Sequence, residues 1–137
     1  MKEIEFYNES IRLKDLINEY RNSNDFKSLE EAILELIEVY DSLNYLGKDE
    51  YLEEIIKLYK DLRDLYIENK KAEELVETYR YLIEYYSYVI RDDMDSNLKD
   101  IYIKELKDTY KILKKIYLKA NIKDDIKDVF VNIREYL

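Results

Sequence analysis

Side chains with oxygen atoms alternate at Asp93, Asp95 and Asn97, which is how a calcium-binding loop begins. Oxygens at this spacing wrap a hard cation, but the loop also needs glycine at its sixth position and glutamate at its twelfth. The chain has Leu98 and Lys104 at those two positions. We therefore predict no metal site here and interpret the segment as an acidic loop between two helices.

Two side chains that commonly carry out catalysis, those of cysteine and histidine, are missing. The chain has no cysteine and no histidine, which removes thiol nucleophiles, disulfides, zinc sites and the commonest general base. Di-metal carboxylate bundles also require histidine. Gly47 is the single glycine, so a glycine-rich phosphate loop cannot form. We expect no enzymatic activity, no catalytic residue and no cofactor.

Tyrosines are concentrated in the stretch 71–90, which reads as a helix. Tyr81, Tyr85 and Tyr88 extend its apolar stripe on one side, so that the apolar and aromatic arc spans about 240°. Tyrosine suits interfaces because its ring is apolar and its hydroxyl can hydrogen-bond. These three residues are candidate partner-binding residues. The alternative is that a central helix with neighbours on two sides needs such a wide arc.

Lysines gather on one side of the next predicted helix, and we single out Lys104, Lys107 and Lys111 as candidate partner-binding residues. The stretch 26–46 instead carries acidic side chains, at Glu30, Glu31, Glu35, Glu38 and Asp41. Opposite charges of this kind can orient a charged partner or a second copy of the chain. The alternative is that both sets are simply solvated and match their helix dipoles.

The acidic excess lies entirely in the first half of the chain. Residues 1–69 have 18 acidic and 9 basic side chains, whereas residues 70–137 have 14 of each, and the net charge is −9. Because phosphate contacts need clustered Lys and Arg, we expect nucleic-acid binding to be unlikely. If nucleic acid did bind, the lysines named above, with Tyr102, would be the place.

Several compositional features bear on location and source. No apolar run approaches the ~18–20 residues needed to span a bilayer, and Met1–Ser10 lacks a signal-peptide core. We therefore predict a cytoplasmic protein that does not interact with membranes, and the lack of cysteine fits a reducing compartment. The absence of glutamine with many interleaved charges is a trend of hyperthermophile proteins, which favours a thermophilic archaeal source. An AT-rich genome would also favour Lys, Ile, Asn and Tyr.

These side chains must be positioned by helices, because the chain has no proline and a single glycine. The 3.6-residue period predicts six helices, over about residues 5–20, 26–46, 48–68, 71–90, 97–117 and 121–137. Gly47 stands where a helix end favours positive φ, and Ser96 or Asn97 is expected to cap the fifth helix. Short turns make consecutive helices antiparallel. We predict one all-α domain, 1–137, with hairpins over about 5–46, 48–91 and 96–137.

The same register of large apolar residues recurs in each hairpin. The spacing is 9, 4, 3 and 4 residues in every copy, and the copies are 46 and 51 residues apart. Their members are Tyr20, Leu29, Ile33, Leu36 and Tyr40; Tyr66, Leu75, Tyr79, Leu82 and Tyr86; and Tyr117, Ile126, Phe130, Ile133 and Leu137. One packing unit used three times predicts a stacked array in which neighbours bury each other's apolar faces.

The first helices of the hairpins share a further spacing, found at Leu13-x₂-Leu16-x₃-Tyr20, Tyr59-x₂-Leu62-x₃-Tyr66 and Tyr110-x₂-Leu113-x₃-Tyr117. This pattern resembles the tetratricopeptide repeat (TPR), in a divergent variety with long helices. The resemblance implies a TPR-like α-α superhelix of three stacked hairpins with a concave groove. It also implies a non-catalytic scaffold or adaptor that binds a protein or peptide partner. An up-and-down helical bundle is the alternative architecture.

The last predicted helix has no polar helix after it to cover its apolar face, which repeat arrays normally need. We therefore expect Phe130, Ile133 and Leu137 to contact a partner or a second copy. The functional prediction is a protein-interaction scaffold that binds through its groove or this uncapped C-terminal hairpin. The alternative is a self-assembling structural or regulatory bundle, a homo-oligomer through the last two helices with no separate ligand.

Overall fold

The computed structural model describes residues 2–47 and 49–120, and within these ranges the chain is all-helical, without a β-strand. Five α-helices and the short 3₁₀-helix η1 are found there: α1 (Glu3–Ser23), α2 (Phe26–Tyr45), η1 (Asp49–Tyr51), α3 (Leu52–Glu68), α4 (Ala72–Val89) and α5 (Ser96–Lys119). The all-α prediction is confirmed for this part of the chain, and the first five predicted helices match α1 to α5. The sixth, over 121–137, lies outside the described residues. None of the described helices is long and apolar enough to cross a membrane.

The chain divides into two compact units, which we call unit 1 (residues 1–69) and unit 2 (residues 70–137) and describe separately. The boundary coincides with the division of charge, because residues 1–69 hold the whole net charge of −9. The prediction of one domain over residues 1–137 stays a prediction.

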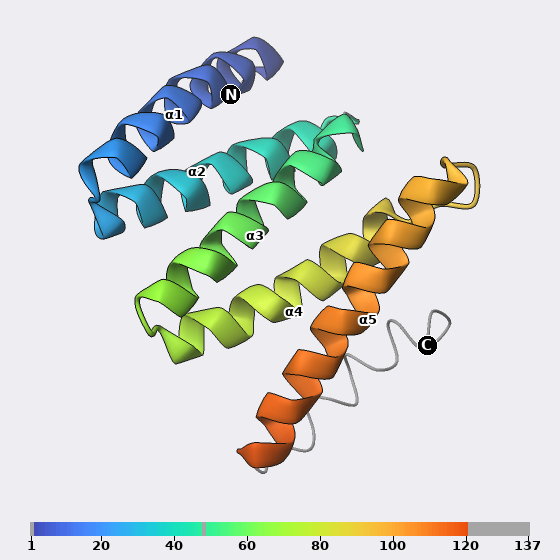
Figure 1. The fold of residues 1–137 in the computed structure, drawn as a ribbon. Helices are drawn as coiled ribbons and strands as arrows, with labels where there is room; N and C mark the ends of the chain where they lie inside the picture. Colours follow the sequence, from blue (N-terminus) through green and yellow to red (C-terminus); the bar gives the residue numbers. More distant parts are fainter. Residues whose placement is uncertain (1, 48, 121–137) are drawn as a thin grey trace. The chain divides into compact units, whose positions relative to one another are not determined.

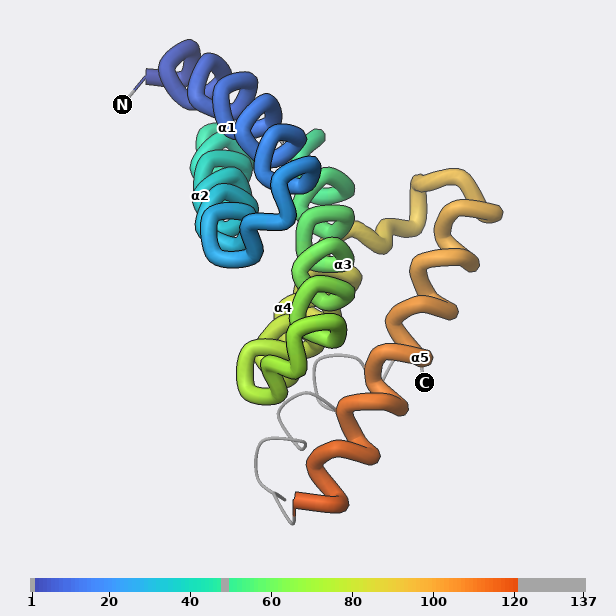
Figure 2. Tube along the Cα trace, turned by 60° about the vertical axis from the view of Figure 1, so that its left-hand side comes forward, coloured from blue at the N-terminus to red at the C-terminus, as the bar shows by residue number. Residues whose placement is uncertain are grey.

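In unit 1, α2 packs against both α1 and α3 (Figure 1), and Figure 2 shows the same three helices from another side. These helices form because apolar residues recur at intervals of three and four, which gathers them on one side of each helix. The best-buried of them are Leu13, Ile33, Leu36, Tyr40, Leu43, Ile55, Ile56 and Leu62. Because α2 has neighbours on two sides, its buried face is the widest of the three.

Short polar turns fix the ends of these helices. Between α1 and α2, Asn24 adopts a left-handed conformation (φ 54°), and Asp25 Oδ1 accepts a hydrogen bond from the Ser28 amide at 3.1 Å. The side chain of Asp25 is therefore the N-cap of α2. After α2, Gly47 has φ 91°, which confirms the positive φ predicted at this glycine.

Unit 2 contains α4 and α5, which pack against each other (Figure 1). Their contact includes the buried Tyr86, whose hydroxyl donates to Glu105 Oε2 at 2.7 Å. The expected cap of α5 is corrected by the structure, because the N-cap is Asp95, whose Oδ2 accepts from the Leu98 amide at 3.1 Å. Ser96, proposed as the cap, is instead the first helical residue, because the carboxylate before it already satisfies the exposed amide.

The repeated register corresponds mostly to buried positions in both second helices that the structure describes, although Leu75 of α4 is only half-buried. Ile33, Leu36 and Tyr40 of α2 are at most 2% exposed, and the matching Tyr79, Leu82 and Tyr86 of α4 are at most 5% exposed. The register thus marks the side of each helix that packs against its neighbours. The third copy, which begins at Tyr117 of α5, continues into residues outside the described part of the chain.

Candidate functional site

A groove of about 170 Å³ lies within unit 1, where the end of α1, the start of α2 and the last turns of α3 meet. We call it the α1–α2–α3 groove. It is lined by Arg21, Leu29, Ile33, Asp61, Asp64, Leu65 and Glu68. Its residues come from three separate helices, so it exists only because unit 1 is folded.

The floor of the α1–α2–α3 groove is apolar. Leu29 and Ile33 are four residues apart on α2 and therefore lie on the same side of that helix. They are 9% and 1% exposed, so both are part of the packed interior and are held in place by it. Leu65 of α3 completes the floor and is only half-buried. An apolar chemical group placed here would bury the remaining exposed surface of these side chains.

The rim of the groove is mostly acidic. Asp61, Asp64 and Glu68 are spaced by three and four residues on α3, so their carboxylates lie along one side of this helix. An ion pair joins Asp61 Oδ2 to the Arg21 guanidinium of α1 at 2.5 Å. Asp64 Oδ1 lies 3.0 Å from Nε of Arg63.

Glu68 differs from the other two rim acids, because it makes no ion pair with any residue between 2 and 120 that the structure describes. It is the last residue of α3, and no basic side chain lies in that last turn. The C-terminal end of a helix carries partial negative charge, which disfavours a carboxylate. At this end of α3, Asn69 Nδ2 donates a hydrogen bond to the Leu65 carbonyl oxygen at 2.8 Å, which partly offsets the partial negative charge of the helix end.

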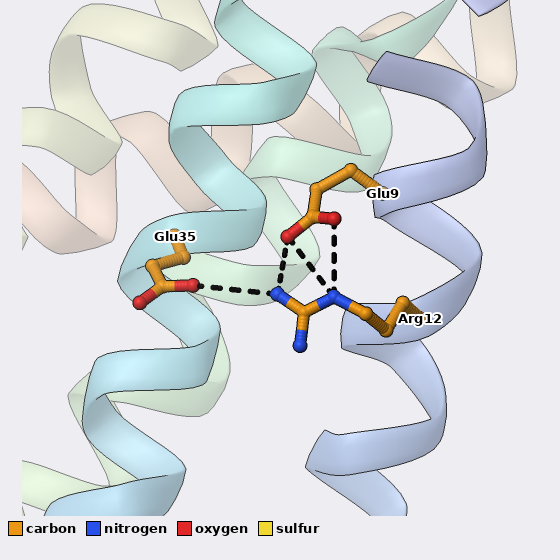
Figure 3. A network of polar contacts seen from close by, with 3 residues as sticks. All are labelled: Glu9, Arg12 and Glu35. Carbon is orange, nitrogen blue, oxygen red and sulfur yellow. Dashed lines mark hydrogen bonds and ion pairs between the residues drawn. The ribbon is translucent and has the colours of Figure 1, made fainter. Parts of the chain in front are cut away.

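A second charged network joins α1 to α2 on the surface of unit 1 (Figure 3). Arg12 Nε lies 3.1 and 3.0 Å from the two carboxylate oxygens of Glu9, and its guanidinium reaches Glu35 Oε2 of α2 at 4.0 Å. The hydrogen bond from Arg12 lowers the pKa of Glu9 below its usual value. All three side chains are substantially exposed, so the network stabilises the hairpin only weakly.

A cluster of aromatic rings and one lysine lies near the other end of α2. The Tyr40 and Tyr51 rings are stacked with centroids 4.9 Å apart, and Lys14 Nζ is 5.7 Å from the Tyr40 centroid. The Tyr40 hydroxyl raises the pKa of Lys14, so this amine stays protonated.

The predicted tyrosine strip lies on α4, in unit 2. Tyr81 and Tyr88 are 45% and 54% exposed, whereas Tyr85 is half-buried. The structure brings Tyr85 and Tyr88 together, with edge-to-face rings 5.6 Å apart, and the Tyr88 hydroxyl donates to Glu84 Oε1 at 2.7 Å. The strip is therefore a real aromatic surface, but part of its hydrogen-bonding capacity is used within α4.

The three predicted lysines lie on α5, and Lys104 and Lys111 are exposed while Lys107 is half-buried. Within the described ranges these three lysines make no ion pair, and they lie on a different helix from the tyrosine strip. The other three candidate residues, Phe130, Ile133 and Leu137, lie outside the described residues, and their role stays a prediction.

Sequence reasoning missed the α1–α2–α3 groove. The signal that could have indicated it is the row of acids at Asp61, Asp64 and Glu68 towards the end of a helix whose last turn has no basic residue. Across the described residues, no group of three Asp or Glu side chains is arranged to hold a metal ion. What the groove can do chemically is bind a group that is apolar at one end and polar or charged at the other.

Comparison of the chain with models of protein families, with curated proteins and with solved structures finds no match to any of them. The observations define this chain as an all-α protein, within its described residues, with a groove that has an apolar floor and an acidic rim. The likeness to TPR proteins rests on the residue spacing alone and stays a prediction.

Proposed function

We propose that this chain is a non-catalytic protein-interaction module that holds a segment of a partner protein in the α1–α2–α3 groove. The observation that carries the proposal is the groove itself, whose apolar floor is packed and whose charged rim is open to solvent. Interaction sites commonly combine an apolar centre with a polar rim. A TPR-like stack of three hairpins in the cytoplasm is part of the proposal, and the shared buried register of α2 and α4 supports it.

The experiment is to pan a random-peptide display library against the full chain. Peptides that bind the groove should bind less well to a Leu65→Ala variant, because this half-buried side chain forms part of the floor. The matched control is Leu34→Ala, which shortens a leucine of unit 1 that is 42% exposed and does not line the groove. A library that yields no binding peptide, or peptides that bind both variants as well as the wild type, would contradict the proposal.

A second candidate is self-assembly, as a structural or regulatory bundle. It is favoured by exposed apolar side chains on α5, at Ile101, Ile112 and Leu118. Such residues are used at interfaces between copies. Light scattering over a wide range of protein concentration tests this candidate, because a mass that stays at that of one chain throughout excludes it.

A further inference from the structure

The size of the α1–α2–α3 groove limits what can occupy it. At about 170 Å³ it is smaller than the roughly 300–1,000 Å³ of sites that bury whole drug-sized ligands or cofactors. A single long side chain is a better match for such a volume. Because the groove opens at the surface of unit 1, that side chain could come from a segment lying across its mouth.

The floor and the rim require opposite properties of this side chain. Leu29, Ile33 and Leu65 offer apolar contacts below, and the carboxylates of α3 stand above them. Lysine and arginine have this form, because their methylene stems pack on apolar surface while their charged heads stay at the polar edge. A bare metal ion would gain nothing from the apolar floor, and a neutral apolar side chain would leave Glu68 without a cation.

The charges of the groove favour a cation over any other head group. Three carboxylates and the Arg21 guanidinium line the groove; Asp61 is paired with Arg21 and Asp64 with Arg63, whereas Glu68 has no ion pair among the described residues. Asp64 and Glu68 are four residues apart, so their like charges repel each other. Both also lie near the negative end of the α3 dipole. An incoming cation would reduce both the repulsion between the two carboxylates and their unfavourable interaction with the helix dipole, whereas an anion would increase the negative charge at this site.

We infer that the α1–α2–α3 groove binds a lysine or arginine side chain of the partner segment, with its stem on Leu29, Ile33 and Leu65 and its head between Asp64 and Glu68. This inference rests on the proposed function, since it names the chemistry of the segment that the groove would hold. Specificity would come from the cation, and the apolar residues beside it in the partner would add affinity.

The experiment compares two fluorescein-labelled peptides by anisotropy with the full chain. One probe is Gly-Ser-Leu-Lys-Leu-Ser-Gly, and the other has norleucine in place of lysine, which keeps the stem and removes the charge. The lysine probe should bind about two- to fivefold more tightly, the gain expected for one solvent-accessible ion pair. Added salt should weaken the binding of the lysine probe and leave the norleucine probe almost unchanged.

Two variants assign the effect to the groove. Glu68→Gln should remove most of the preference for lysine, whereas Glu53→Gln, at the opposite end of the same helix and outside the groove, should keep it. Equal binding of the two probes, binding of neither, or a preference that survives Glu68→Gln would overturn the inference. The proposed function would still stand if the peptide library yields binders that depend on Leu65 and lack a basic residue.

Discussion

A carboxylate at the wrong end of a helix should lower the stability of the protein, and Glu68 provides the test. It ends α3 and has Asp64 one turn before it, on the same side of the helix. We expect Glu68→Gln to raise the free energy of unfolding. Removing the repulsion from Asp64 should contribute about 0.2–0.5 kcal/mol, and removing the unfavourable interaction with the helix dipole about 0.3–1 kcal/mol.

The two contributions together amount to about 1 kcal/mol. Urea denaturation followed by circular dichroism can resolve such a change, since for a small protein it corresponds to a shift of the midpoint by about 0.5 M. The slope of the transition should stay the same, because the surface exposed on unfolding does not change. Glutamine and glutamate have similar helix propensities, so the substitution isolates the charge.

Glu53→Gln is the matched control, because it makes the same substitution in the first turn of α3. A carboxylate there is favoured by the helix dipole, so its removal should lower the free energy of unfolding by about 0.3–1 kcal/mol. Both effects should shrink in molar salt. If the two variants shift the midpoint in the same direction, or Glu68→Gln destabilises the protein, the electrostatic reasoning about the groove is refuted.

The remaining predictions concern substitutions at four single positions. Lys70 has φ 56°, so Lys70→Gly should raise the free energy of unfolding by about 0.5–1 kcal/mol. Asn24→Gly should have a much smaller effect in the same urea assay, because asparagine tolerates this conformation. The hydrogen bonds from Ser28 lower the pKa of Asp25, so its cap stabilises the protein above the carboxyl's ordinary pKa of about 4 and is lost as the pH falls through its lowered value. Asp25→Ala should therefore lower the melting temperature at neutral pH and leave it unchanged in strong acid. If the variant and the wild type differ in melting temperature by the same amount at every pH, the ionisation of Asp25 does not control the strength of the cap. The buried amide of Asn44 has no hydrogen-bond partner among the described residues, so Asn44→Leu should raise the free energy of unfolding by about 1–2 kcal/mol. A loss of stability in that variant would mean that the amide is satisfied after all.

The local features of the fold were predictable from the sequence. The 3.6-residue period identified α1 to α5, because each helix must place its apolar residues on the side that packs. The turn at Gly47 was predictable because a helix end that needs positive φ favours glycine. The 3₁₀-helix η1 was not predicted, since periodicity does not distinguish the first turn of α3 from a tighter turn before it.

The α1–α2–α3 groove could not be predicted in the same way. The Arg21–Asp61 ion pair joins residues 40 positions apart, and two of the floor residues, Leu29 and Ile33, come from a third helix, α2. Which residues meet across helices depends on how the helices pack, and this information is absent from the pattern within any one helix. The predicted tyrosines all lie on α4 and the predicted lysines all lie on α5, so the periodicity within one helix was enough to group each set.

The two-residue connection between α1 and α2 has a consequence for how the protein reaches its native state. The two helices, which bury Ile17 and Ile33 among others, can pack against each other after only a short loop has closed. Proteins dominated by such local contacts fold in microseconds to milliseconds. The chain also has no proline, so the slow isomerisation of prolyl bonds cannot delay it. Unit 1 should therefore refold quickly from denaturant, with the α1–α2 hairpin as its first structured element.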